Sequence, residues 1–182
     1  MKNKLIYRNF TLVELLTVIG IIAILAGIII PVSMNVRARG VKTSCLNNLR
    51  QIGLALNMYA DDNKGFYPYC TQFPSNPPVG QEGMPGIAET LLPYAKAEKV
   101  FLCPADAGEK YFRSEGSSYD WKAEVYNGLK IGRKNVVEES LPALPNIPVM
   151  FDYDNFHGNP DSRTAKNYLY PTGNVSGELL DK

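Results

Sequence analysis

An apolar run of 21 residues, from Leu12 to Val32, constrains this chain more than any other feature of its sequence. The run is interrupted only by Glu14, Thr17, Gly20, Gly27 and Pro31. A helix needs about 20 apolar residues to cross a bilayer. The apolar segment of a cleaved secretory signal is shorter, typically about 7–15 residues. The run therefore predicts a membrane-spanning helix that stays in the protein.

The rest of the chain has the composition of a folded domain. Of the 182 residues, 45% are hydrophobic and 20% are charged, which argues against extended disorder. The net charge of +1 lacks the basic excess of nucleic-acid-binding proteins, so no nucleic-acid partner is expected. Three basic residues precede the apolar run and three follow it, so positive charge does not fix its orientation. They are Lys2, Lys4 and Arg8, then Arg37, Arg39 and Lys42.

One carboxylate, Glu14, lies two residues inside the apolar run. A charged side chain in hydrocarbon costs several kcal/mol, so such a residue usually marks a function or a partner. The alternative is that Glu14 extends its carboxylate to the lipid headgroups.

The residues from Asn9 to Leu16 resemble the prepilin signature of type IV pilins and type II secretion pseudopilins. In that family a short basic leader and a peptidase site precede Phe-Thr-Leu-x-Glu-Leu-Leu and an apolar helix. The resemblance implies a leader at residues 1–9, cleavage before Phe10, and Glu14 as the fifth mature residue. The residue before the cut is normally glycine, whereas this chain has Asn9.

The same resemblance assigns roles and partners. It implies that Phe10 is N-methylated after cleavage and that Glu14 pairs with the freed amine of Phe10 on a neighbouring subunit. Pro31 stands where the family often has a helix-kinking proline. The implied partners are the prepilin peptidase, an inner-membrane platform protein, membrane lipid, and copies of this protein and other pseudopilins.

A second resemblance covers later segments of the chain. Residues 45–56, 100–106 and 117–119 look like a pseudopilin-like group known from Planctomycetes, Lentisphaerae and relatives. That group often ends with a histidine, nine residues and Asp-Gly. Here His157 is followed at a longer distance by Thr172-Gly173, so the end motif is degenerate.

Apolar residues continue the helix beyond the membrane segment at helical spacing. Cys45, Leu49, Ile52, Leu56 and Tyr59 follow one another at intervals of four, three, four and three residues, which is one face of an α-helix. The pattern predicts a helix from Phe10 to about Asp62, bent at Pro31, with Gly65 as a candidate cap.

The residues after this helix favour short elements. A short helix is expected over 87–94, ending at or just past Pro93. Alternating polarity predicts strands at 120–126 and 148–152. Residues 167–170 and 174–179 flank a Pro-Thr-Gly turn and predict a hairpin.

These expectations combine into an α+β, pilin-like fold, with a long N-terminal helix packed on a small antiparallel sheet. The expected organisation is a leader at 1–9 and a transmembrane or filament-core helix at 10–32. An amphipathic helix half follows at 33–62, and a periplasmic globular body at 63–182.

The sequence offers little catalytic chemistry. His157 is the one histidine in the chain, and no nucleophile or metal-protease motif accompanies it. We therefore expect a surface histidine and no enzyme activity. Asp152, Asp154 and Asp161 crowd a polar stretch with oxygen ligands that suit Ca²⁺. They lack the spacing of an EF-hand, so the expectation is no cofactor, with Ca²⁺ as the alternative.

The three cysteines leave alternatives open. A body outside the inner membrane permits disulfides, and the second resemblance supports Cys45 and Cys103 as a pair. Cys70 is the competing partner for Cys103. The remaining possibility is three reduced cysteines, with Cys45 a small buried apolar residue.

The functional prediction is a structural subunit of a type II secretion pseudopilus or type IV pilus-like filament. The subunit would sit in the inner membrane as a single-pass protein, with its body in the periplasm, and then enter the filament. The alternative is a membrane-tethered periplasmic enzyme or binding module that uses the helix only as an anchor.

Overall fold

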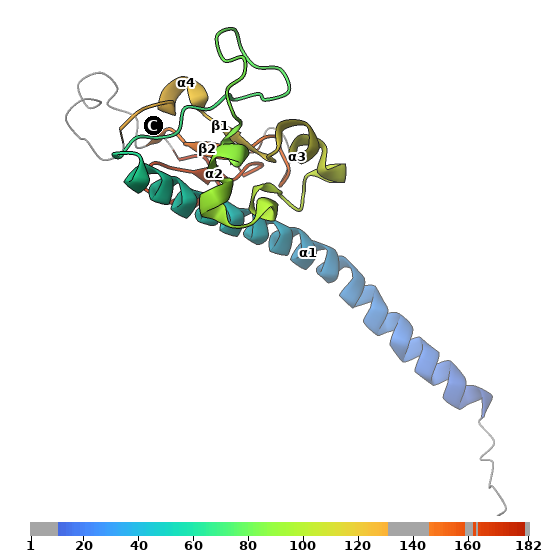
Figure 1. The fold of residues 1–182 in the computed structure, drawn as a ribbon. Helices are drawn as coiled ribbons and strands as arrows, with labels where there is room; N and C mark the ends of the chain where they lie inside the picture. The colour runs from blue at the N-terminus through green and yellow to red at the C-terminus, as the bar shows by residue number, and fades with distance from the viewer. Residues whose placement is uncertain (1–10, 131–145, 159–161, 163, 181–182) are drawn as a thin grey trace, which may run out of the picture. The chain divides into compact units, whose positions relative to one another are not determined.

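The computed structural model describes residues 11–130, 146–158, 162 and 164–180 (Figure 1). The chain separates into two compact units, Met1–Arg39 and Gly40–Lys182. One helix, α1, runs from Leu12 to Asp62 and contributes to both units. The predicted start at Phe10 lies outside the described residues. Because α1 continues through position 31, Pro31 does not end it, and a bend there stays a prediction.

The end of α1 follows the predicted signals with one difference. The Gly65 amide donates to the carbonyl of Ala60 over 2.7 Å, the bond that closes a Schellman motif. The left-handed residue of that motif is Lys64, with φ of 57°, and Gly65 follows it with φ of 84°. The cap therefore spans both residues rather than Gly65 alone.

The second half of α1 buries the predicted face. Cys45, Leu49 and Ile52 are fully buried and Leu56 is 3% exposed, whereas Leu54 on another face is 65% exposed. This contrast confirms the helical stripe. Its burial is the main apolar contribution of α1 to the core of the second unit.

A four-stranded antiparallel sheet packs on that face, in the order β1-β2-β3-β4. The strands are β1 Tyr119–Trp121, β2 Met150–Asp152, β3 Tyr168–Leu169 and β4 Val175–Ser176. Tyr119 pairs with Asp152, and Met150 pairs with both Trp121 and Leu169. The last two strands confirm the predicted hairpin, and the whole architecture confirms the α+β class.

Helix and sheet meet most closely at Gly53. A Cβ added there would lie 3.0 Å from Cδ1 of Leu169, closer than side-chain packing normally allows. The missing side chain lets β3 approach α1, which is a use of glycine that helical periodicity does not reveal.

The short helices lie around this core. They are α2 Ile87–Ala95, η1 Glu98–Phe101, η2 Ala107–Glu109, α3 Lys110–Glu115 and α4 Ala123–Tyr126. The helix predicted at 87–94 is confirmed as α2, which contains Pro93. Tyr94 of α2 packs edge-on against Tyr59 of α1 with ring centroids 5.7 Å apart, so α2 lies on the second half of α1 (Figure 1).

The strand predicted at 120–126 is wrong in its second half. Extended pairing ends at Trp121, and α4 begins at Ala123. Ala123 and Tyr126 are both buried, three residues apart, and the Tyr126 amide donates to the carbonyl of Lys122 over 3.1 Å. A separation of three places both residues on one face of a helix but on opposite faces of a strand. Their joint burial, with Tyr126 packed against Tyr67, therefore fits the helix.

Two of the motif segments recognised in the sequence meet at one buried carboxylate, Asp106, which is 5% exposed. Its Oδ2 accepts hydrogen bonds from the Ser118 hydroxyl at 2.8 Å, the Phe112 amide at 3.0 Å and the Tyr111 amide at 3.1 Å. Asp106 thereby fixes the first turn of α3 to the residue that precedes β1.

Replacing Asp106 tests this junction. Asp106→Ala leaves two backbone amides and a hydroxyl without their acceptor, so the free energy of unfolding should fall by about 3–5 kcal/mol. The exposed Asp61→Ala serves as the control and should change it by less than about 0.5 kcal/mol. Urea denaturation of the detergent-solubilised chain, followed by near-ultraviolet circular dichroism, measures both. Equal midpoints for the two variants would contradict the assigned role.

Candidate functional site

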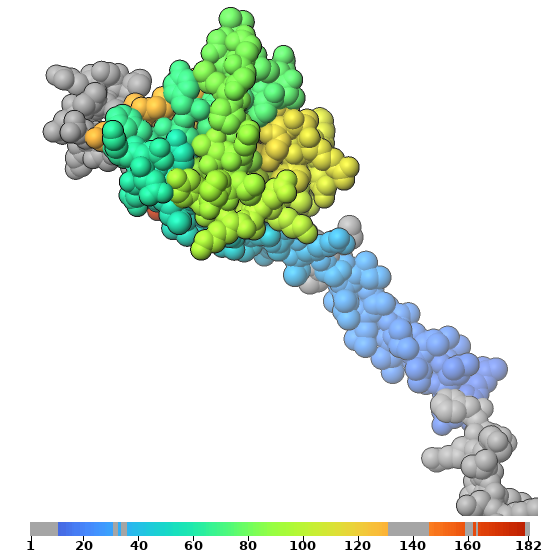
Figure 2. All heavy atoms as spheres, viewed as in Figure 1, coloured from blue at the N-terminus to red at the C-terminus, as the bar shows by residue number. Residues whose placement is uncertain are grey.

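The described part of the first unit presents an apolar helical surface that no other described residue buries. Within α1, Leu12–Ile30 spans 19 residues with a mean hydropathy of 2.8, and none of it is buried. Figure 2 shows this segment in blue as a narrow column of atoms. The segment is long and apolar enough to cross a membrane. It covers most of the predicted range 10–32.

The start of this helix carries a reciprocal cap. The Thr11 hydroxyl and amide donate to Glu14 Oε2 at 2.7 and 3.0 Å, and the Glu14 amide donates to the Thr11 hydroxyl at 3.2 Å. This is a capping box. The spacing of Thr11 and Glu14 is its sequence signature, which the charge pattern of the apolar run alone does not reveal.

The cap lowers the free-energy cost of placing the Glu14 carboxylate near hydrocarbon. The Glu14 carboxylate accepts two hydrogen bonds within its own chain and lies at the positive end of the helix dipole. Both effects reduce the cost of a carboxylate near hydrocarbon. Asn9 and Phe10 lie outside the described residues, so cleavage, methylation and the intersubunit pairing of Glu14 stay predictions.

The second unit contains a disulfide between Cys45 of α1 and Cys103, which follows η1. The two Cα atoms are 5.2 Å apart and 58 residues separate them in sequence. This is the pairing favoured from the sequence. Cys70 is the free, buried cysteine of the chain. Its Sγ lies 3.2 Å from the Thr90 hydroxyl, and burial raises the pKa of its thiol to about 11.

His157 packs against this disulfide, which corrects the expectation of a surface histidine. Its imidazole is 2% exposed, with Nε2 lying 3.5 Å from Cys103 Sγ and 3.4 Å from Asp152 Oδ2. The His157 amide donates to the carbonyl of Ala165 at 2.9 Å. That bond holds the loop after β2 over the disulfide, a placement that local sequence does not encode.

Burial disfavours charge on both members of the Asp152–His157 pair. It raises the pKa of Asp152 to about 7, against the opposing effect of the Asn167 amide, which donates to Oδ2 at 2.7 Å. It lowers the pKa of His157 to about 4. The pair therefore favours its neutral form near pH 6, although its 3.4 Å separation also fits an ion pair. We favour the neutral form because both groups are almost fully enclosed.

The candidate calcium residues do not share one environment. Asp152 is fully buried, whereas Asp154 is exposed and accepts a hydrogen bond from the Tyr111 hydroxyl at 2.9 Å. Asp161 lies outside the described residues. A calcium site built from these three residues stays a prediction.

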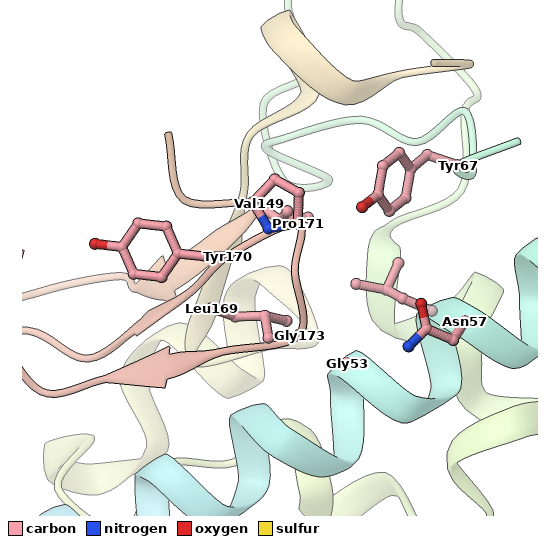
Figure 3. Close-up of a pocket in the computed structure, with 9 residues that line it drawn as sticks. Gly53, Asn57, Tyr67, Val149, Leu169, Tyr170, Pro171 and Gly173 are labelled. Atoms are coloured by element: carbon pink, nitrogen blue, oxygen red, sulfur yellow. The ribbon is translucent and has the colours of Figure 1, made fainter. Parts of the chain in front are cut away.

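A small pocket lies between α1 and the β3–β4 hairpin (Figure 3). Gly53 and Asn57 line it from α1, and Leu169 and Gly173 from the hairpin side. It admits about one water molecule, so this pocket is too small for an organic substrate.

Reduction of the disulfide should weaken the second unit. The Cys45–Cys103 bond restricts the unfolded chain, so its loss should lower the free energy of unfolding by about 2–4 kcal/mol. Urea denaturation with and without a phosphine reductant, in a chelator, measures the change. Cys70→Ser provides the background in which no third thiol can exchange. Identical midpoints in the two conditions would contradict a stabilising disulfide.

Comparison with known proteins gives one partial match. A family model described as a protein of unknown function, DUF1559, matches residues 36–96. This stretch includes most of the second half of α1 and all of α2. The family is typical of planctomycete pseudopilin-like proteins, and the match is compatible with a pseudopilin-like protein. No curated protein and no solved structure matches the chain.

Proposed function

We propose that this protein is a structural subunit of a pseudopilus or pilus-like filament that assembles from the inner membrane. The subunit is held by α1 as a single-pass protein with its globular body in the periplasm. A prepilin peptidase removes residues 1–9, and a platform protein extracts the subunit into a filament made of copies of this chain and other pseudopilins.

The observation that carries the proposal is the uncovered surface of Leu12–Ile30, none of which is buried within the chain. Such a surface needs an apolar cover, because each large side chain left in water costs about 1.5–3 kcal/mol. Lipid supplies that cover before assembly, and neighbouring helices supply it in the filament. The exchange gains little bulk hydrophobic free energy, so specific polar contacts direct it.

The cap at Glu14 supplies one such polar contact. In the isolated subunit the carboxylate bonds to Thr11. In a filament core it can also accept from the freed amine of a neighbour's Phe10, and this opposite charge stabilises a carboxylate removed from water. The supporting features are the capping box at the start of α1, the apolar helix and the DUF1559 match.

The alternative, a tethered enzyme or binding module, needs a polar pocket in the body. The pocket of Figure 3 admits only about one water molecule. Asp106, one buried carboxylate of the body, is committed to internal hydrogen bonds. This pocket therefore gives the tethered alternative no support, and the exposed apolar segment of α1 carries the assembly proposal.

Assembly is tested by shearing cells and sedimenting filaments. Glu14→Ala should leave the amount of membrane-inserted protein unchanged, because it removes a charge from the apolar segment. It should reduce sedimented filaments by about tenfold or more, since it leaves a neighbour's amine unpaired. Glu124→Ala, at an exposed glutamate of the body, is the matched control and should assemble normally.

Two outcomes count against the proposal. A normal filament yield from Glu14→Ala would contradict the proposed role of Glu14 in pairing with a neighbouring subunit. Absence of this protein from every sedimentable filament, with the protein remaining in the membrane as a monomer, favours the tethered alternative.

Processing is tested separately by the intact mass of the membrane protein. The expected mature chain starts at Phe10 and carries one added methyl group. Asn9→Gly restores the usual residue before the cut and should raise the processed fraction if Asn9 slows the peptidase. A mature protein that keeps Met1 in both forms would rule out cleavage.

A further inference from the structure

Three potential metal ligands converge at the disulfide. The ligand atoms of Cys45, Cys103 and His157 all lie within 4.8 Å of one another. Both cysteines are fully buried and the imidazole is 2% exposed. They come from separate segments: α1, the turn after η1 and the loop after β2.

The spacing of these atoms suits a zinc-class ion. With bonds of about 2.3 Å to sulfur and about 2.0–2.1 Å to nitrogen, two ligands in a tetrahedron lie about 3.3–3.8 Å apart. The distance from His157 Nε2 to Cys103 Sγ is 3.5 Å. The two sulfurs must part when the disulfide opens, which side-chain rotation allows at a Cα separation of 5.2 Å.

A carboxylate that can act as a fourth ligand lies beside the histidine. Asp152 Oδ2 lies 3.4 Å from His157 Nε2, again the edge of such a tetrahedron. Asp152 is fully buried, and its Oδ1 has no hydrogen-bond partner among the described residues. A buried polar oxygen without a partner is costly, and a cation held by both oxygens of the ionised Asp152 side chain would satisfy Oδ1.

We propose that the reduced protein binds one Zn²⁺ ion through the thiolates of Cys45 and Cys103, the imidazole of His157 and the carboxylate of Asp152. Two thiolates and an imidazole select a zinc-class ion over Ca²⁺, which prefers oxygen ligands alone. This site is distinct from the calcium site considered above, although it shares Asp152.

The metal and the disulfide are alternatives. Near pH 6, binding converts two thiols to thiolates and the neutral Asp152 carboxyl to its carboxylate, so three protons are released. Asp152 takes one proton back when the metal leaves. Oxidation passes two electrons to the disulfide of a thiol–disulfide exchange protein, which takes up two protons and becomes a dithiol. Zn²⁺ then leaves as the Cys45–Cys103 bond forms. In both states the same link joins α1 to the turn after η1, so the body keeps its fold before and after oxidation.

The test uses the full chain in detergent, reduced with a phosphine, and titrated with Zn²⁺ or with Co²⁺ as a spectroscopic probe. The reduced protein should bind one ion. The Co²⁺ form should show thiolate-to-metal charge transfer and the intense visible bands of a tetrahedral site. The oxidised protein should bind none at this site.

Variants assign the ligands. Cys103→Ser should abolish the thiolate-to-cobalt band or leave only half of its intensity. His157→Ala and Asp152→Asn should each weaken Zn²⁺ binding by at least about tenfold, and His157→Cys should restore part of the affinity. Cys70→Ser should bind as the parent does, because Cys70 lies against Thr90 instead.

If reduction or substitution loosens the fold, near-ultraviolet circular dichroism reports whether the metal restores it. Zn²⁺ should then restore the native spectrum of the reduced parent. The proposal is overturned if the reduced parent, folded or not, binds no ion. It is equally overturned if the bound Co²⁺ lacks thiolate charge transfer, or if Cys70→Ser weakens binding as much as His157→Ala does.

Discussion

Packing of one face of α1 on the sheet is the constraint on which the second unit depends. Leu49 and Ile52 are fully buried on that face, and Gly53 lets Leu169 approach the helix backbone. The disulfide anchors one end of this face through Cys45, and Tyr59 packs on α2 at the other.

The features that could be predicted are those set by local periodicity. Apolar spacing identifies the helix α1, and a turn between two short polar-apolar segments identifies the final hairpin. Each pattern is complete within a few residues. The strand at 120–126 failed for a related reason. Trp121, Ala123 and Val125 alternate as in a strand, whereas Ala123 and Tyr126 are spaced as on one helical face. The long-range burial of Tyr126 against Tyr67 decides between the two patterns.

The candidate sites show the same division. The Thr11–Glu14 cap was available from sequence, since its signature is a spacing of three. The environment of His157 was not, because it depends on a loop after β2 reaching Cys103 across the fold. The hydrogen bond from Ser118 to Asp106 could be predicted only in part. The two motif segments, 100–106 and 117–119, are recognisable in the sequence, but neither indicates that it contacts the other.

The contact between Gly53 and Leu169 also sets an order for biogenesis. The apolar face of α1 is synthesised early, but the hairpin that covers it lies late in the sequence. During synthesis that face has no native partner, and non-local pairing of this kind forms slowly. Exposed apolar surface in an incomplete chain promotes aggregation. A chain built this way therefore benefits from emerging beside a membrane or a holding chaperone, which shields the stripe until β3 arrives.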